Sequence, residues 1–417
     1  MKVFLTVLIV IFTGALGLYN FQSDAIFFGL HSYDLAIALL NIVFILLILM
    51  NPVFSNALFS TPFTFFTIIY FYVLGIVLFM PFRGDINIFM SFRVGRDFFI
   101  LPLFYLLIND IIRNDNFSYY KNLFYFLAIF TSIQILLNSI SPELVSDLFQ
   151  EVRARERYKY EFQRNDFISK TMLFPHFGAI YIFFTIRNSN KNNIVNSLLL
   201  LLFLMAVGLQ GFRSYLLVLS LLLLLYLVLQ IQSKKVLRLL FWACLTFPVL
   251  LVFDFVWLNG QITNKFISIP LDFVSRSDEG STTFGRIELD LIYTIPRFLE
   301  KPIFGWGFIH HNSGYGKEIG LLDTSIAGNR AFTLYSVDSG YLTLLNYFGI
   351  FGVLFILIFY IKFLLSPNFK YCRYILLFSF LLLLLTLPTH GSFYSDFGLV
   401  PFTFIMALSI SRGLSLI

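Results

Sequence analysis

Apolar runs long enough to cross a bilayer recur along almost the whole of this 417-residue chain, and polar or charged breaks separate them. A helix needs about 20 predominantly apolar residues to span the hydrocarbon core of a membrane. Because 58% of the residues are hydrophobic and only 12% are charged, a water-soluble domain could not cover this much apolar side chain. The pattern therefore predicts an all-α fold, a polytopic integral membrane bundle of helices.

Twelve membrane-spanning helices are predicted from these runs. They cover residues 3–18, 35–50, 63–80, 98–112, 123–140, 172–186, 194–212, 215–231, 236–258, 340–361, 374–387 and 397–410. The first run follows Lys2 and ends near Ala15 and Gly17, a pattern that would also suit a cleavable signal peptide. The eleven further runs favour a retained first helix.

One polar stretch, residues 259–337, is too long to be a simple turn between two helices. A long loop in an otherwise compact chain usually carries function. We therefore divide the chain into helices one to nine in residues 1–258, a large loop in residues 259–337, and three further helices in residues 338–417.

Basic residues in short loops set the predicted orientation, because Lys and Arg stay on the cytoplasmic side. Counting spans from a cytoplasmic Lys2 puts both termini inside, and the large loop outside together with segments 83–96 and 141–170. Four arginines in short outer loops break this rule: Arg83, Arg93, Arg96 and Arg213. Their excess indicates anionic ligands on the outer side.

The sequence lacks the usual motifs of metal and nucleotide chemistry. Cys244 and Cys372 are too scattered for a disulfide framework or a thiolate metal site, and the five histidines lack zinc-site spacing. No glycine-rich phosphate loop occurs either. We therefore expect no metal, no cofactor and no nucleic-acid partner, while the net charge of +6 suits contact with anionic membrane lipid.

Charges of alternating sign run through residues 151–161 of the second outer segment. Glu151 with Arg155, and Arg157 with Glu161, are spaced to pair on a short helix. One interpretation is a solvated, salt-bridged surface helix, and the other is a gate over an anionic substrate.

Arg213 interrupts an otherwise apolar stretch from residue 194 to residue 231. An uncompensated guanidinium at membrane depth is costly, so it must reach the interface, pair with an acid or bind a ligand. In the predicted topology Arg213 lies at the outer surface of a tight helical hairpin. It is either a snorkelling interfacial side chain or a phosphate-binding one.

Within the large loop, a polar run at 277–285 offers Ser and Thr caps for a helix that starts near Arg286. Arg286 and Asp290 share one face of this helix, and Pro296 then bends or restarts it before Arg297.

A glycine- and aromatic-rich segment, residues 302–308, follows and contains Trp306. It leads directly to His310 and His311. Aromatic rings beside paired polar groups suit the face of a sugar.

Motifs in this order resemble those of the O-antigen polymerase and O-antigen ligase superfamily. They are Gly211-Phe212-Arg213-Ser214 before a helix, Phe284-Gly285-Arg286 and residues 302–308 in a large outer loop, and Asp338-Ser339-Gly340 running to Gly349-Ile350-Phe351-Gly352. The match covers residues 208–352 in motifs and the rest in hydropathy alone. It implies a GT-C-like fold in a bacterial inner membrane and metal-independent glycosyl transfer from an undecaprenyl-diphosphate-linked oligosaccharide at the periplasmic face.

The resemblance also implies roles for individual residues. Arg213 and Arg286 match the two arginines that hold the diphosphate, where guanidinium forks stabilise the charge on the departing group. Arg297 and Trp306 are further candidates for binding the diphosphate or the sugar. The attacking sugar hydroxyl needs a base to accept its proton. The candidates are Asp338, His310 and His311.

These candidates for the base each have a second interpretation. Asp338 equally suits the N-cap of the helix that follows, and the two histidines equally suit a surface or stacking role.

Asp338-Ser339 stands where ligases of the superfamily carry His-Asn, and this difference favours a polymerase over a ligase that delivers glycan to the lipid A core. A polysaccharide flippase or transporter also fits twelve spans, although no internal repeat is visible and the notable charges gather at the outer face. A noncatalytic scaffold is a third alternative. By resemblance, a chain-length regulator protein is an expected partner.

Overall fold

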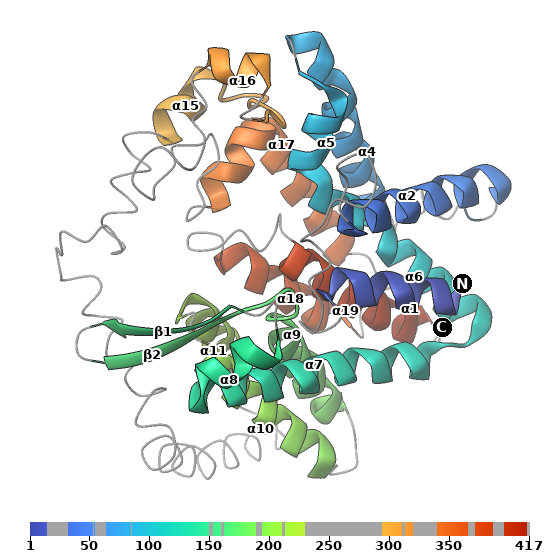
Figure 1. Ribbon diagram of the computed structural model, residues 1–417. Helices are drawn as coiled ribbons and strands as arrows, with labels where there is room; N and C mark the ends of the chain where they lie inside the picture. The colour runs from blue at the N-terminus through green and yellow to red at the C-terminus, as the bar shows by residue number, and fades with distance from the viewer. Residues whose placement is uncertain are drawn as a thin grey trace.

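The computed structural model describes residues 1–14, 32–52, 54, 64–84, 86–149, 153–159, 162–188, 194–210, 213–229, 294–310, 313–319, 340–365, 372–386 and 396–414. Most of these residues are helical, as the apolar runs predict (Figure 1). The helices are α1 (Lys2–Phe12), α2 (Ser32–Met50), α4 (Thr64–Phe79), α5 (Ile88–Gly95), α6 (Pro102–Asn114), α7 (Phe117–Ile140), α8 (Pro142–Leu148), α9 (Phe174–Asn188), α10 (Ile194–Leu209), α11 (Arg213–Leu229), α15 (Ile295–Glu300), α16 (Gly314–Glu318), α17 (Gly340–Leu365), α18 (Arg373–Thr386) and α19 (Asp396–Leu414), with short 3₁₀ turns η2 (Met80–Arg83) and η3 (Arg96–Ile100).

A helix overlaps every predicted span within the described part of the chain, and the predicted span 236–258 lies outside it. Within the described ranges, four helices are long and apolar enough to cross a membrane: Ser32–Met50, Thr64–Arg83, Phe117–Ile140 and Gly340–Leu365. Shorter apolar helices accompany them, among them α9, α10 and α18. The total of twelve spans stays a prediction.

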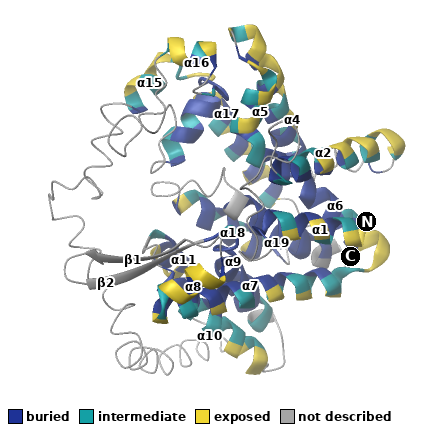
Figure 2. Ribbon diagram, viewed as in Figure 1, coloured by how far each residue is buried: buried dark blue, intermediate teal, exposed yellow. Residues whose placement is uncertain are grey.

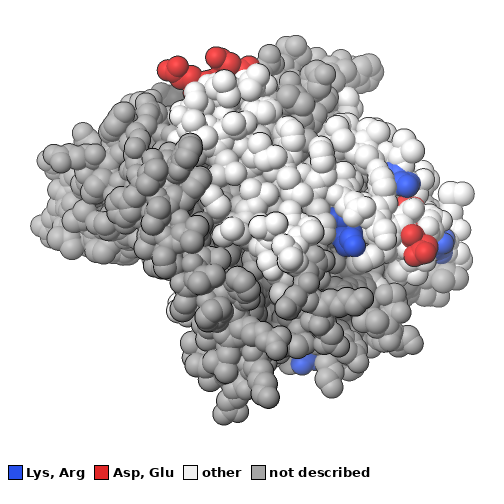
Figure 3. Space-filling model, turned by 90° about the horizontal axis from the view of Figure 1, so that it is seen from below, with Lys and Arg blue, Asp and Glu red and all other residues white. Residues whose placement is uncertain are grey.

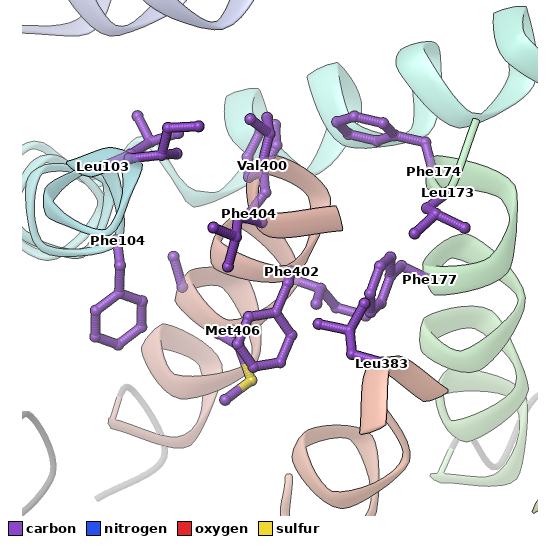
Figure 4. Packing of buried hydrophobic residues seen from close by; sticks show 14 of the residues in the cluster. Leu103, Phe104, Leu173, Phe174, Phe177, Leu383, Val400, Phe402, Phe404 and Met406 are labelled. Carbon is purple, nitrogen blue, oxygen red and sulfur yellow. The ribbon is translucent and has the colours of Figure 1, made fainter. Parts of the chain in front are cut away.

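The core of the bundle forms around α19, where aromatic side chains of several helices converge. Phe402 and Met406 of α19 lie between Phe104 of α6 and Phe177 of α9 (Figure 4). Phe104 in turn stacks on Phe66 of α4, with ring centroids 4.0 Å apart. The abundance of Phe therefore packs helix against helix through ring contacts, which stabilise a core beyond simple burial.

Other apolar side chains face outward, as they would in lipid. On α2, Leu39, Ile42, Leu46 and Leu49 recur every three or four residues and all are exposed (Figure 2). The described surface in Figure 3 is interrupted by few charged side chains. Contiguous exposed apolar surface of this kind is unfavourable in water but matches the hydrocarbon of a bilayer. The protein is therefore a membrane-embedded helical protein.

The segment after α8 is a β-hairpin, so the predicted short, salt-bridged helix is wrong. Strands β1 (Arg153–Lys159) and β2 (Phe162–Ile168) pair antiparallel, with Arg155 opposite Asp166. The pattern Arg-x-Arg-x-Arg-x-Lys from residue 153 to 159 has a period of two, which is the strand period. The helix prediction rests on a spacing of four between charges of opposite sign, which is the helix period. Glu151 and Glu161 lie outside the described residues.

Charged side chains at the two ends of the bundle make contacts between segments that are far apart in sequence. At one end, Lys2 lies over the Tyr119 ring, 3.9 Å from its centroid. At the other end, Arg96 pairs with Asp34 at 2.9 Å, and Lys170 lies 5.2 Å from the centroid of the Tyr33 ring. Which of these ends faces the periplasm stays a prediction.

Replacing Arg96 by methionine is expected to destabilise the protein by about 1–3 kcal/mol, because it leaves a carboxylate without its partner in a nearly water-free site. The Asp34 side chain is 5% exposed and that of Arg96 is 27% exposed. Burial lowers the pKa of the Arg96 guanidinium, but the charges of Asp97 and Asp34 outweigh it and raise the pKa above its ordinary value. Arg96 is therefore charged at any physiological pH.

Thermal unfolding in detergent measures this effect as a lower melting temperature. Arg93→Met, in the same segment and exposed, is the matched control and should leave the melting temperature unchanged. Adding Asp34→Asn to Arg96→Met should recover part of the loss. A single variant as stable as the wild type would show that the pair contributes nothing.

Candidate functional site

Helix α17 is broken at Gly349, and this break is the centre of the candidate site. The backbone angles of Gly349, φ 66° and ψ −179°, fall in a region that only glycine adopts readily. The break leaves N–H groups of the second half-helix and carbonyl groups of the first without their usual helical partners. At membrane depth such groups must be satisfied inside the protein.

The glycine- and aromatic-rich segment of the large loop supplies the missing partners. Three backbone hydrogen bonds join the two: Ile350 N–H to the Pro302 carbonyl (2.8 Å), Phe351 N–H to the Ile303 carbonyl (3.0 Å) and Trp306 N–H to the Asn346 carbonyl (2.6 Å). A Cβ on Gly305, whose φ is +69°, would lie 2.6 Å from the Asn346 carbonyl oxygen. Both glycines are therefore required by the close approach of two backbones.

These contacts bring together two of the motifs on which the family resemblance rests. Residues 302–308 of the large loop and the Gly349 to Gly352 motif are far apart in sequence, yet each completes the hydrogen bonding of the other. Figure 1 shows α15, α16 and α5 gathered around the end of α17. The large loop is thus anchored on the bundle at this point.

Trp306 is held inside this junction and is only 4% exposed. Its indole Nε1–H donates to the Arg297 carbonyl at 2.8 Å. The Arg297 guanidinium, 37% exposed, pairs with Glu300 at 3.4 Å within the same short helix. The structure therefore brings the predicted residues Arg297 and Trp306 together, but through the Arg297 backbone, with the charge of Arg297 directed to a neighbouring carboxylate.

Two further cations, Arg83 and Lys301, meet beside Trp306. Arg83 donates from Nη1 to the Trp306 carbonyl at 3.1 Å, and Lys301 Nζ lies 4.2 Å from the centroid of the Trp306 ring. Lys301 also donates to the Tyr315 hydroxyl at 3.1 Å. Among the described residues, no carboxylate forms an ion pair with either cation.

These cations line an open hollow of about 340 Å³. Its lining consists of Arg83, Lys301, Pro302, Ile303, Phe304 and Tyr315. Arg83 was visible in the sequence as one of the arginines that break the charge rule. Lys301 was not singled out, because a lone lysine in a turn carries no spacing signal.

Among the remaining predicted site residues Arg286, His310, His311 and Asp338, the structure describes only His310. The His310 carbonyl accepts from the Ser313 N–H at 3.0 Å and from its hydroxyl at 2.7 Å. The Ser313 hydroxyl oxygen in turn accepts from the Gly316 N–H at 2.9 Å, which caps α16. Arg286, His311 and Asp338 lie outside the described residues. Helix α17 begins at Gly340, two residues after Asp338, and both the N-cap interpretation and the catalytic one stay predictions.

Arg213 is the first residue of α11, and α10 ends at Leu209. The two helices predicted on either side of Arg213, residues 194–212 and 215–231, are observed as α10 and α11. Nearby, His176 of α9 and Gln210 are fully buried, and the Gln210 side chain has no hydrogen-bond partner among the described residues. The His176 ring packs edge-on against Tyr215, with centroids 5.2 Å apart. Buried polar side chains in a membrane bundle are costly, and they commonly mark functional positions.

The candidate site residues that the structure describes thus form two groups rather than one. Figure 1 places α11 beside α9, far from α15 and α16. Arg213 and Trp306 therefore belong to separate elements, and residues 230–293, which include Arg286, lie between them in the chain and outside the described part. The proposed pairing of Arg213 with Arg286 stays a prediction.

Burial of Cys372 raises the pKa of its thiol to about 12, so it is neutral and a poor nucleophile. Within the described part of the chain, no three His, Cys, Asp or Glu side chains converge.

A comparison with protein-family models finds no match to this chain. No curated protein matches it either.

Proposed function

We propose that this protein is a glycosyltransferase that polymerises undecaprenyl-diphosphate-linked oligosaccharide repeat units at the periplasmic face of the bacterial inner membrane. The single observation that carries the proposal is the docking of the 302–306 segment into the break of α17. Two motifs that the sequence pattern connects with this chemistry form one backbone unit, and cations and aromatic rings lie around it.

Such a reaction requires groups that neutralise a leaving diphosphate without a metal. Guanidinium groups do so through forked hydrogen bonds to phosphate oxygens. In the proposal Arg213 and Arg286 hold the diphosphate, and Asp338, His310 or His311 accepts the proton of the attacking sugar hydroxyl. The anchored large loop then covers the sugars while the lipid chains stay between helices.

A deletion strain tests this proposal against the ligase alternative. We expect surface lipopolysaccharide capped by one repeat unit, because ligation continues when polymerisation stops. Uncapped core with lipid-linked polymer accumulating would instead identify a ligase and overturn the proposal.

Purified protein in detergent separates catalysis from transport. With a lipid-linked repeat unit as the only substrate and no ion gradient, we expect a ladder of longer lipid-linked products on a gel. Absence of any product from folded, monodisperse protein would count against an enzyme.

A further inference from the structure

We propose that Arg83 and Lys301 bind the phosphoryl group of a membrane lipid whose hydrocarbon chain lies along α17. These two residues are different from Arg213 and Arg286, to which the diphosphate site is assigned. The inference does not rest on the proposed function, because it follows from the hollow beside Trp306 and the surface next to it.

The first argument is the unused hydrogen-bonding capacity of the two cations. A guanidinium has five N–H donors in a fixed fork, and Arg83 uses Nη1 for the carbonyls of Gly305 and Trp306. The donors on Nη2 and Nε have no described partner. The ammonium of Lys301 has three donors and spends one on the Tyr315 hydroxyl. Hydroxyl, ammonium and guanidinium together match the oxygens of a phosphoryl group.

The second argument is the charge of the hollow. Two positive side chains line it, and no described carboxylate pairs with either of them. Both side chains are half-buried, so water screens them incompletely. Cations held together at the edge of a membrane bundle are stabilised by an anion, and phosphate is the anion that a bilayer interface supplies.

The third argument is the apolar surface that continues from the hollow. Ile303 and Phe304 line it and are 60% and 62% exposed. The Phe304 ring contacts Phe351 of α17, with centroids 5.7 Å apart. From there a stripe of exposed apolar residues follows one face of the helix: Phe351, Leu354, Ile358, Ile361 and Leu365.

This stripe indicates that the ligand is a lipid. Helical rise of 1.5 Å per residue makes the stripe about 21 Å long, more than half of a hydrocarbon core of about 30 Å. A free phosphate would use the cations and ignore the stripe, and a neutral lipid would do the reverse. A lipid with a phosphoryl head fits both, whether it is a phospholipid of the bilayer or a polyprenyl phosphate.

Native mass spectrometry of the purified protein tests the site. Undecaprenyl phosphate and phosphatidylglycerol are the two probes, and diacylglycerol is the probe without phosphate. The Arg83→Gln, Lys301→Gln double variant should bind both phosphorylated lipids at least about tenfold more weakly, because charge-assisted hydrogen bonds are lost. Arg93→Gln, an exposed arginine of the same outer segment, should bind them like the wild type.

The outcomes separate the sources of the ligand. A loss for both phosphorylated lipids supports a general phosphoryl-lipid site, and a loss for undecaprenyl phosphate alone supports a polyprenyl-selective one. Equal binding by the double variant and the wild type overturns the proposal, as does an equal loss with Arg93→Gln. Unchanged affinity when Ile358 is replaced by asparagine would refute the placement of the chain. Melting temperatures of all variants confirm that they are folded.

Discussion

Gly349→Val is expected to undock the large loop from α17 and to abolish the activity that depends on it. A valine there must adopt φ near +66°, which costs about 1–3 kcal/mol for a residue other than glycine. Its Cβ would also collide with the Ile303 carbonyl oxygen, a backbone atom that cannot rotate away. We expect the three hydrogen bonds of the junction to be lost together, since they share this close approach.

Limited proteolysis measures the undocking directly, because a released loop is cut faster than an anchored one. Gly75→Val is the matched control: Gly75 is an exposed glycine of α4, and a Cβ there would meet no atom within 4 Å. The control should resist proteolysis like the wild type. If Gly349→Val were cleaved at the wild-type rate and kept full activity, the junction would have no part in function.

The position of most helices was predictable, and the reason is physical. Apolar runs must be helical in lipid, because only an intra-segment ladder satisfies the backbone there. For α2 the predicted range 35–50 and the observed Ser32–Met50 end at the same residue. Hydropathy alone therefore locates such elements without any knowledge of their neighbours.

The break in α17 was not predictable from the same signal. Gly349 lies inside an apolar run, and a glycine in such a run is compatible with a continuous helix. At the break, residues 302–306 from another part of the chain make the hydrogen bonds that a continuous helix would make within itself. Backbone pairing between distant segments leaves no periodic pattern of apolar residues in either segment. Residues 302–306 and the region of Gly349 could therefore be recognised only by their family-like motifs.

The candidate site was predictable only where chemistry is unusual for a membrane. Arg213 and Arg83 were visible because a guanidinium is rare in an outer loop or an apolar stretch. Lys301 and the buried Gln210 were missed, because neither belongs to a pattern. Their importance depends on which side chains surround them, and that information exists only in the fold.

Charge reversal at Arg213 or Arg286 is expected to reduce polymer formation by about a hundredfold or more. Removing one group that stabilises developing negative charge typically costs that much in rate, and a glutamate adds repulsion. Lysine at either position should retain part of the activity, because it keeps the charge but loses the planar fork that grips two oxygens.

The comparison with Arg93→Glu makes this test specific. The three charge-reversal variants each remove a positive charge from a predicted outer segment, so none should disturb a topology set by inner basic residues. Arg93 is exposed and has no part in the proposed chemistry, so its variant should make polymer at the wild-type level once membrane insertion is verified. Equal yields from the Arg213, Arg286 and Arg93 variants would remove both arginines from the mechanism. A selective loss would mean that these two guanidinium groups act on the substrate, since general charge on the outer surface is reduced equally in all three.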